Sequence, residues 1–162
     1  MKRILWILII LFVLGTPRLE ANPAVFLNAF GETATAYLND SFLLLGTTAD
    51  GFVADIIQKG TALEIVTNVQ KRVRIIRAKL KAVAQSRIAE VDKRLIGLLD
   101  QAYACMDHQA WALIQYIQER SPETAKRFEA QRTDCLERLE RVSEFYATLP
   151  PPPEVAEPLS TR

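Results

Sequence analysis

The sequence predicts an all-α protein, folded as an antiparallel four-helix bundle built from two helical hairpins. Through four long segments, apolar residues recur at alternating spacings of four and three, the rhythm of helices that pack along a left-handed seam. Helix breakers are scarce: of 6 Gly and 8 Pro, four Pro stand together at 150–153, and only Gly97 lies between Gly60 and Pro122. An all-β protein would need turn residues far more often.

The first 21 residues have the pattern of a secretory signal peptide. Lys2 and Arg3 precede an unbroken apolar run at 4–14, and Gly-Thr-Pro at 15–17 ends that run. The run is too short to cross a bilayer, which takes about 20 residues, and its length is typical of a signal sequence. We predict cleavage after Ala21, a helical domain at 22–149 and a Pro-rich disordered tail at 150–162. The alternative is an uncleaved membrane anchor.

Removal of residues 1–21 would leave a nearly neutral chain. Three of the 20 basic residues and one of the 19 acidic residues precede Asn22, so 17 basic and 18 acidic residues remain. This balance gives no reason to expect a nucleic-acid partner, and we expect no membrane span in the mature chain. The predicted location is exported, either periplasmic or secreted.

The first two helices are expected at 32–58 and from Thr61 onward. Between them, Gly60 suits the left-handed residue that ends a helix, and Thr61 with Glu64 has the spacing of a capping box. The hairpin should therefore turn at Gly60. The expected core stripes are Leu38, Phe42, Leu45, Ala49, Phe52 and Ile56 in the first helix, and Ala62, Val66, Val69, Val73, Ile76, Leu80 and Val83 in the second.

The third and fourth helices are expected at 87–120 and from Ser121 to the Pro run. Ser121 suits the N-cap and Pro122 the first helical position. The expected stripes are Ile88, Val91, Leu95, Leu98, Ala102, Met106, Ala110, Leu113 and Ile117, then Ala125, Phe128, Cys135, Leu139, Val142, Tyr146 and Leu149.

The boundary near Ser86 is the weakest, because no strong breaker lies there. The alternative architecture is one continuous rod at 61–120, with the first and fourth helices folded back on its ends. We favour the compact bundle because it buries more apolar surface.

Cys105 and Cys135 lie fifteen residues on either side of Arg120, next to the predicted turn. In an antiparallel hairpin, residues equidistant from the turn lie at the same height. An exported chain with an even number of cysteines meets an oxidising compartment, so we predict that they form a disulfide. The alternative is two buried thiols acting as small hydrophobic residues.

The sequence contains no recognisable catalytic, metal or cofactor motif. His108 is the single histidine, and no C-x-x-C-H haem motif or set of zinc ligands accompanies it. Met106 lies about 200° from His108 around a helix, so the two side chains cannot share a ligand. No Ser or Cys nucleophile has a recognisable base nearby. We therefore expect no enzymatic activity, no bound metal and no cofactor.

Basic residues are concentrated in the second predicted helix. Arg74, Arg77 and Lys81 share one flank, whereas the first helix has acidic residues and no cation. Packing of these two helices against each other should neutralise part of the charge, and an excess should remain for an anionic partner. The full set of candidate binding residues is Lys71, Arg72, Arg74, Arg77, Lys79 and Lys81.

The fourth helix, by contrast, balances its own charge through acid-base pairs four residues apart. The expected pairs are Glu123 with Arg127, Asp134 with Arg138, and Glu137 with Arg141.

The expected function is that of an exported, non-catalytic binding or scaffold protein of the cell envelope. Its partner would be a protein or an anionic envelope component, such as a phospholipid head group or a polysaccharide, and self-association through helix faces is a further option. The alternative is a helical sensor or carrier that holds a small ligand or haem in the bundle core.

Overall fold

The computed structural model describes residues 23–149, with side chains from Phe30 onward. This part of the chain forms four helices and no strand: α2 (Pro23–Val53), α3 (Lys59–Ala84), α4 (Glu90–Glu119) and α5 (Pro122–Ala147). The predicted all-α class is confirmed. The predicted signal peptide and the predicted tail lie outside the described residues.

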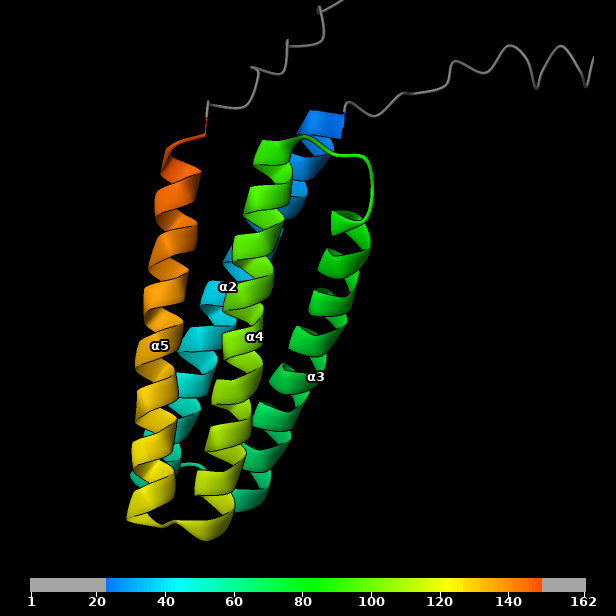
Figure 1. The fold of residues 1–162 in the computed structure, drawn as a ribbon. Coiled ribbons are helices and arrows are strands. Elements are labelled where there is room, and N and C mark those ends of the chain that lie inside the picture. The colour runs from blue at the N-terminus through cyan, green and yellow to red at the C-terminus, as the bar shows by residue number, and fades with distance from the viewer. Residues whose placement is uncertain (1–22, 150–162) are drawn as a thin grey trace, which may run out of the picture.

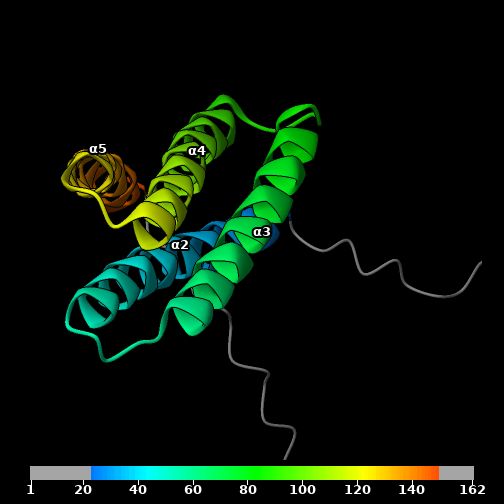
Figure 2. The ribbon, with the colours of Figure 1, turned by 90° about the horizontal axis from the view of Figure 1, so that it is seen from below.

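The four helices run alternately in opposite directions, as an antiparallel bundle (Figure 1). α2 and α3 form one hairpin, and α4 and α5 form the other. α4 packs against each of the other three helices, whereas α3 and α5 do not contact each other. The view along the bundle places α3 and α5 on opposite sides, with α4 between them (Figure 2). The two hairpins are therefore joined mainly through α4.

The predicted stripes supply most of the core. Two predictions at helix ends are wrong: Ile56 is 80% exposed and Val91 is 48% exposed, because the first lies in a turn and the second at the start of α4. The core also contains Ile96, Leu99 and Tyr103, which lie beside the predicted stripe of α4. The largest fully buried apolar side chains are Leu38, Leu45, Leu80, Leu99, Tyr103, Met106, Leu113, Ile117 and Phe128.

The turn between α2 and α3 does not lie at Gly60, contrary to the prediction. α2 ends at Val53, and Asp55 takes the left-handed conformation with φ of 56°. The N–H groups of Ile56 and Ile57 donate to the carbonyl of Gly51 at 2.8 and 2.9 Å. A Cβ at Gly51 would lie 2.7 Å from Ile57 Cδ1, so a larger residue at this position would force the Ile57 side chain to shift.

Because α3 begins before Gly60, Thr61 cannot be its N-cap, and the predicted capping box of Thr61 with Glu64 is absent. Gly60 and Thr61 lie within the first turn of α3. The N-cap is Gln58, whose side chain makes no capping hydrogen bond.

α3 and α4 are separate helices, so the continuous-rod alternative is wrong. α3 ends at Ala84, and the chain reverses through 85–89 before α4 begins at Glu90. Ser86 helps to end α3 although no Gly or Pro lies at this turn. Its N–H and its hydroxyl both donate to the carbonyl of Val83, at 2.9 and 2.6 Å, and so satisfy a carbonyl at the end of the helix.

The turn between α4 and α5 lies where it was predicted. Arg120 adopts the left-handed conformation with φ of 51°, and its N–H donates to the carbonyl of Tyr116 at 2.7 Å. Ser121 is the N-cap of α5, because its hydroxyl accepts a hydrogen bond from the Thr124 N–H at 3.2 Å. The Arg120 guanidinium also pairs with Asp55 Oδ1 at 2.8 Å, which ties this turn to the one between α2 and α3.

Candidate functional site on the outer face of alpha3

α3 carries seven basic residues and one acidic residue, Glu64. Its apolar residues at 62, 66, 69, 73 and 80 recur at helical spacing and are buried against the bundle. Six of the nine other positions between 71 and 81 are cations, and they line the flanks and the outer face of this segment. α3 is therefore the most basic helix among those the structure describes.

Two of the six predicted binding residues form ion pairs with α4. Arg74 Nε donates to Asp107 Oδ1 and Oδ2 at 2.9 and 3.1 Å, and Arg77 Nε donates to Asp100 Oδ1 at 3.1 Å. The Arg77 and Asp100 side chains are 24% and 29% exposed, while Arg74 is 60% exposed. Partly solvated pairs of this kind contribute about 0–1 kcal/mol each. Their main effect is to align α3 with α4.

The partner expected for these cations was the acidic helix α2, and this expectation is wrong. Two acidic residues of the helix predicted at 32–58 pair elsewhere. Asp50 lies 3.9 Å from Arg132 of α5, and Asp55 pairs with Arg120. The flank of α3 that carries Arg74 and Arg77 packs against α4. The acidic residues of α4 therefore pair with these cations in place of those of α2.

The other four predicted binding residues are Lys71, Arg72, Lys79 and Lys81, which we call the free cations of α3. All four are exposed, and none has an ion-pair partner between residues 23 and 149. Ile75 lies among them and is 49% exposed. Lys71 and Ile75 also line a shallow groove of about 400 Å³ with Thr67, Gln70, Arg74 and Ala78. The outer face of α3 therefore presents an apolar residue surrounded by positive charge.

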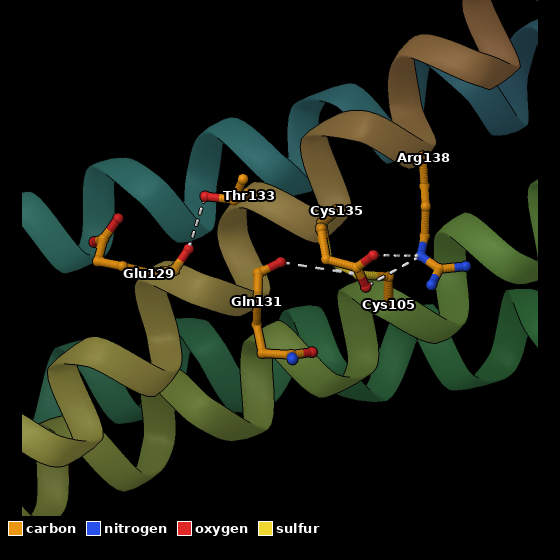
Figure 3. The surroundings of a disulfide bond; sticks show 7 residues. Cys105, Glu129, Gln131, Thr133, Cys135 and Arg138 are labelled. Carbon is orange, nitrogen blue, oxygen red and sulfur yellow. Dashed lines mark hydrogen bonds and ion pairs between the residues drawn. A yellow bond between two sulfur atoms is a disulfide. The ribbon is translucent and has the colours of Figure 1, made fainter.

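The predicted disulfide is present and joins α4 to α5 (Figure 3). The Cα atoms of Cys105 and Cys135 lie 5.4 Å apart, and both residues are buried. Asp134 Oδ2 lies 3.1 Å from Cys105 Sγ, and Arg138 Nε donates to both oxygens of Asp134 at 3.2 Å. The carboxylate next to the disulfide is therefore neutralised by a cation of its own helix.

Tyr103 and Gln109 are the largest of the fully buried side chains that place a polar group in the core. The Tyr103 hydroxyl donates to the carbonyl of Ala34 at 2.6 Å and thereby links α4 to α2. Burial raises the pKa of Tyr103 well above its usual range, and the charge of Tyr37 raises it further. Gln109 is fully buried, and neither its amide nitrogen nor its amide oxygen has a hydrogen-bond partner in the described part of the chain.

The structure offers no constellation for metal chemistry between residues 23 and 149. No group of three His, Cys, Asp or Glu side chains is close enough to hold a metal ion in this range. His108 is exposed on α4. None of the described helices is long and apolar enough to cross a membrane.

Trp111, which was not among the predicted site residues, is 46% exposed on α4. Arg127 of α5 lies over its ring, with the guanidinium carbon 5.8 Å from the ring centroid. Of the three acid-base pairs expected on α5, Asp134 with Arg138 is present, whereas Glu123 with Arg127 and Glu137 with Arg141 are not. The signal in the sequence for the contact between Arg127 and Trp111 was a tryptophan that lies outside the apolar stripe of its helix.

Comparisons with known proteins add no assignment. Neither a family model, nor a curated protein, nor a solved structure matches this chain.

Proposed function

We propose that the protein is an exported, non-catalytic helical binding module that uses the outer face of α3 to bind an anionic partner of the cell envelope. The observation that carries the proposal is the set of free cations of α3, which lie around the exposed Ile75. A concentrated positive surface on a nearly neutral chain raises the local density of anionic groups and directs their approach.

The ion pairs with α4 divide the six candidate residues into two groups. Arg74 and Arg77 hold α3 against α4, so replacing them would disturb helix packing as well as surface charge. Lys71 and Lys79 have no such partner in the described part of the chain and can be changed without loss of a known contact. They are therefore better test positions than Arg74 and Arg77, although all six contribute to the positive potential.

The test is binding to vesicles of phosphatidylglycerol mixed with phosphatidylcholine, compared with phosphatidylcholine alone. We expect the wild type to bind only the anionic vesicles. The double variant Lys71→Gln/Lys79→Gln should bind several-fold more weakly. Binding should also fall between about 50 and about 500 mM salt, because the screening length shrinks from roughly 14 to roughly 4 Å.

The matched control is Lys126→Gln/Arg141→Gln, which removes the same charge from exposed positions on α5. This variant should bind nearly as well as the wild type. Equal weakening of both double variants would mean that net charge, and not the face of α3, determines binding. If neither variant nor salt changes binding, the proposal for α3 is wrong, and circular dichroism of each variant excludes unfolding as the cause.

The export part of the proposal is supported by the disulfide between Cys105 and Cys135, since such bonds persist mainly in oxidising compartments. Intact-mass measurement of the protein recovered outside the cytoplasm should give a chain that begins near Asn22. A mass that includes Met1, found in a membrane fraction, would favour the anchor alternative instead.

A second candidate function, a carrier with a small ligand in the bundle core, is favoured by one observation, the unpartnered amide of Gln109. A buried polar group without a partner is destabilising, and a bound ligand would satisfy it. Native mass spectrometry of the purified protein tests this candidate. A bound molecule that is lost in Gln109→Leu would support it. An unliganded wild type together with a stabilised Gln109→Leu variant would contradict it.

A further inference from the structure

A small cleft between α4 and α5 brings together side chains from both helices. His108, Trp111 and Ala112 of α4 and Arg127 and Gln131 of α5 line this cleft, which has a volume of about 220 Å³. We call it the Trp111 cleft. It lies on the α4–α5 side of the bundle, and α3 does not contact α5, so it is separate from the basic face of α3.

The polar groups around the Trp111 cleft have no protein partners among residues 23–149. Arg127 forms no ion pair there, and its one described contact is the ring of Trp111. The Trp111 indole N–H, the His108 imidazole and the Gln131 side-chain amide likewise make no hydrogen bond in this range. All four groups present at least one N–H donor, and the guanidinium supplies the one permanent positive charge among them.

We propose that the Trp111 cleft binds a carboxylate group that carries a small apolar portion. The planar guanidinium matches a carboxylate through two parallel N–H···O bonds. One fixed positive charge suits a monoanion better than a phosphate dianion. The volume corresponds to roughly seven water molecules, which leaves space for a few carbon atoms beyond the carboxylate.

Two covalent connections join the walls of the cleft close to it. Cys105 lies three residues before His108, and Cys135 lies four residues after Gln131, so the disulfide is about one helical turn away. The turn at 120–121 joins α4 to α5 at the other end of the cleft. A site whose walls cannot separate loses less freedom when a ligand binds.

The test is fluorescence titration of the full chain with Trp6→Phe, in which Trp111 is the single tryptophan. Acetate, butyrate and a short blocked peptide with one Glu are added at constant ionic strength set with chloride. We expect a saturable change in Trp111 emission that chloride does not produce. Tighter binding of butyrate than of the peptide identifies a free small acid as the ligand, and the reverse order identifies an acidic side chain of a protein.

Arg127→Gln should weaken this binding at least about tenfold, because it removes a charge-assisted pair of hydrogen bonds. The matched control is Lys126→Gln, which removes the same charge from the adjacent exposed residue and should change the affinity less than twofold. Reduction of the disulfide in the otherwise unchanged protein should weaken binding several-fold while the helical circular dichroism persists.

Three results would overturn the proposal. They are a response to acetate no larger than that to chloride, an Arg127→Gln variant that binds as tightly as the parent, and tighter binding of inorganic phosphate than of acetate.

Discussion

Removal of the disulfide should destabilise the protein by an amount that follows from its place in the chain. Cys105 and Cys135 are separated by 30 residues, and cross-linking a loop of this length lowers the entropy of the unfolded chain by about 12 cal/mol/K. At 25 °C this corresponds to about 3.6 kcal/mol of stability. With an unfolding entropy of roughly 2.1 cal/mol/K per residue over residues 23–149, Tm should fall by about 13 °C.

The measurement is urea and thermal unfolding of Cys105→Ala/Cys135→Ala, followed by circular dichroism. Alanine is chosen because both positions are buried, and serine would place a hydroxyl in an apolar site. The reduced wild type is the matched control, since it keeps both sulfur atoms and loses only the cross-link. We expect the two to lose similar stability. A loss below about 1 kcal/mol in the reduced protein would refute the loop-closure argument. A large loss confined to the double variant would assign the effect to packing.

Three further changes have directions that the structure determines. Tyr103→Phe removes the hydrogen bond to Ala34 and should cost about 1 kcal/mol of stability in chemical unfolding. Because burial raises the pKa of Tyr103 in the folded state, the wild type should also lose stability as pH rises above about 10, where the unfolded tyrosine ionises. The variant should lose less stability over the same pH range. Gly97→Ala should raise stability by about 0.5–1 kcal/mol, because no atom lies within 4 Å of the new Cβ, whereas Gly51→Ala should gain less or lose stability against Ile57. Ser121→Ala should cost about 1 kcal/mol through the lost N-cap, and a midpoint unchanged in urea would contradict this.

The helices and the disulfide could be predicted from sequence because each depends on spacing along the chain. Helical periodicity places Val66 and Val73, or Phe128 and Cys135, on one face whatever lies around them. The disulfide follows from the symmetry of the two cysteines about Arg120, a relation that any antiparallel hairpin preserves.

The turn between α2 and α3 could not be placed from sequence because two different properties of glycine compete there. Gly60 has the conformational freedom that a helix end often requires, but the turn forms where the absence of a side chain at Gly51 lets Ile57 pack closely. The left-handed position itself is occupied by Asp55, a residue type that tolerates this conformation. A close approach between residues is a property of the folded chain and leaves no local signal.

The partners of the surface cations were mispredicted for a similar reason. Neighbours along the chain suggested that α2 would neutralise α3, yet Arg74 and Arg77 lie on the flank that meets α4. Periodicity determines which residues share a flank, but only the packing order determines which helix that flank meets. The same limit applies to Arg127, whose contact with Trp111 replaces an expected pair within its own helix.

The ion pair between Asp55 and Arg120 has a consequence for how the bundle assembles. Asp55 lies in the turn after α2 and Arg120 caps the end of α4, so the two belong to different hairpins, and each takes a backbone conformation that is unfavourable outside a formed turn. Each hairpin consists of contacts local in sequence and can form early, whereas this pair requires both turns at once. Arg120 also lies over the ring of Phe52, 5.1 Å from its centroid. We therefore expect this contact to form only when the hairpins dock, so that Asp55→Asn accelerates unfolding and leaves the folding rate almost unchanged.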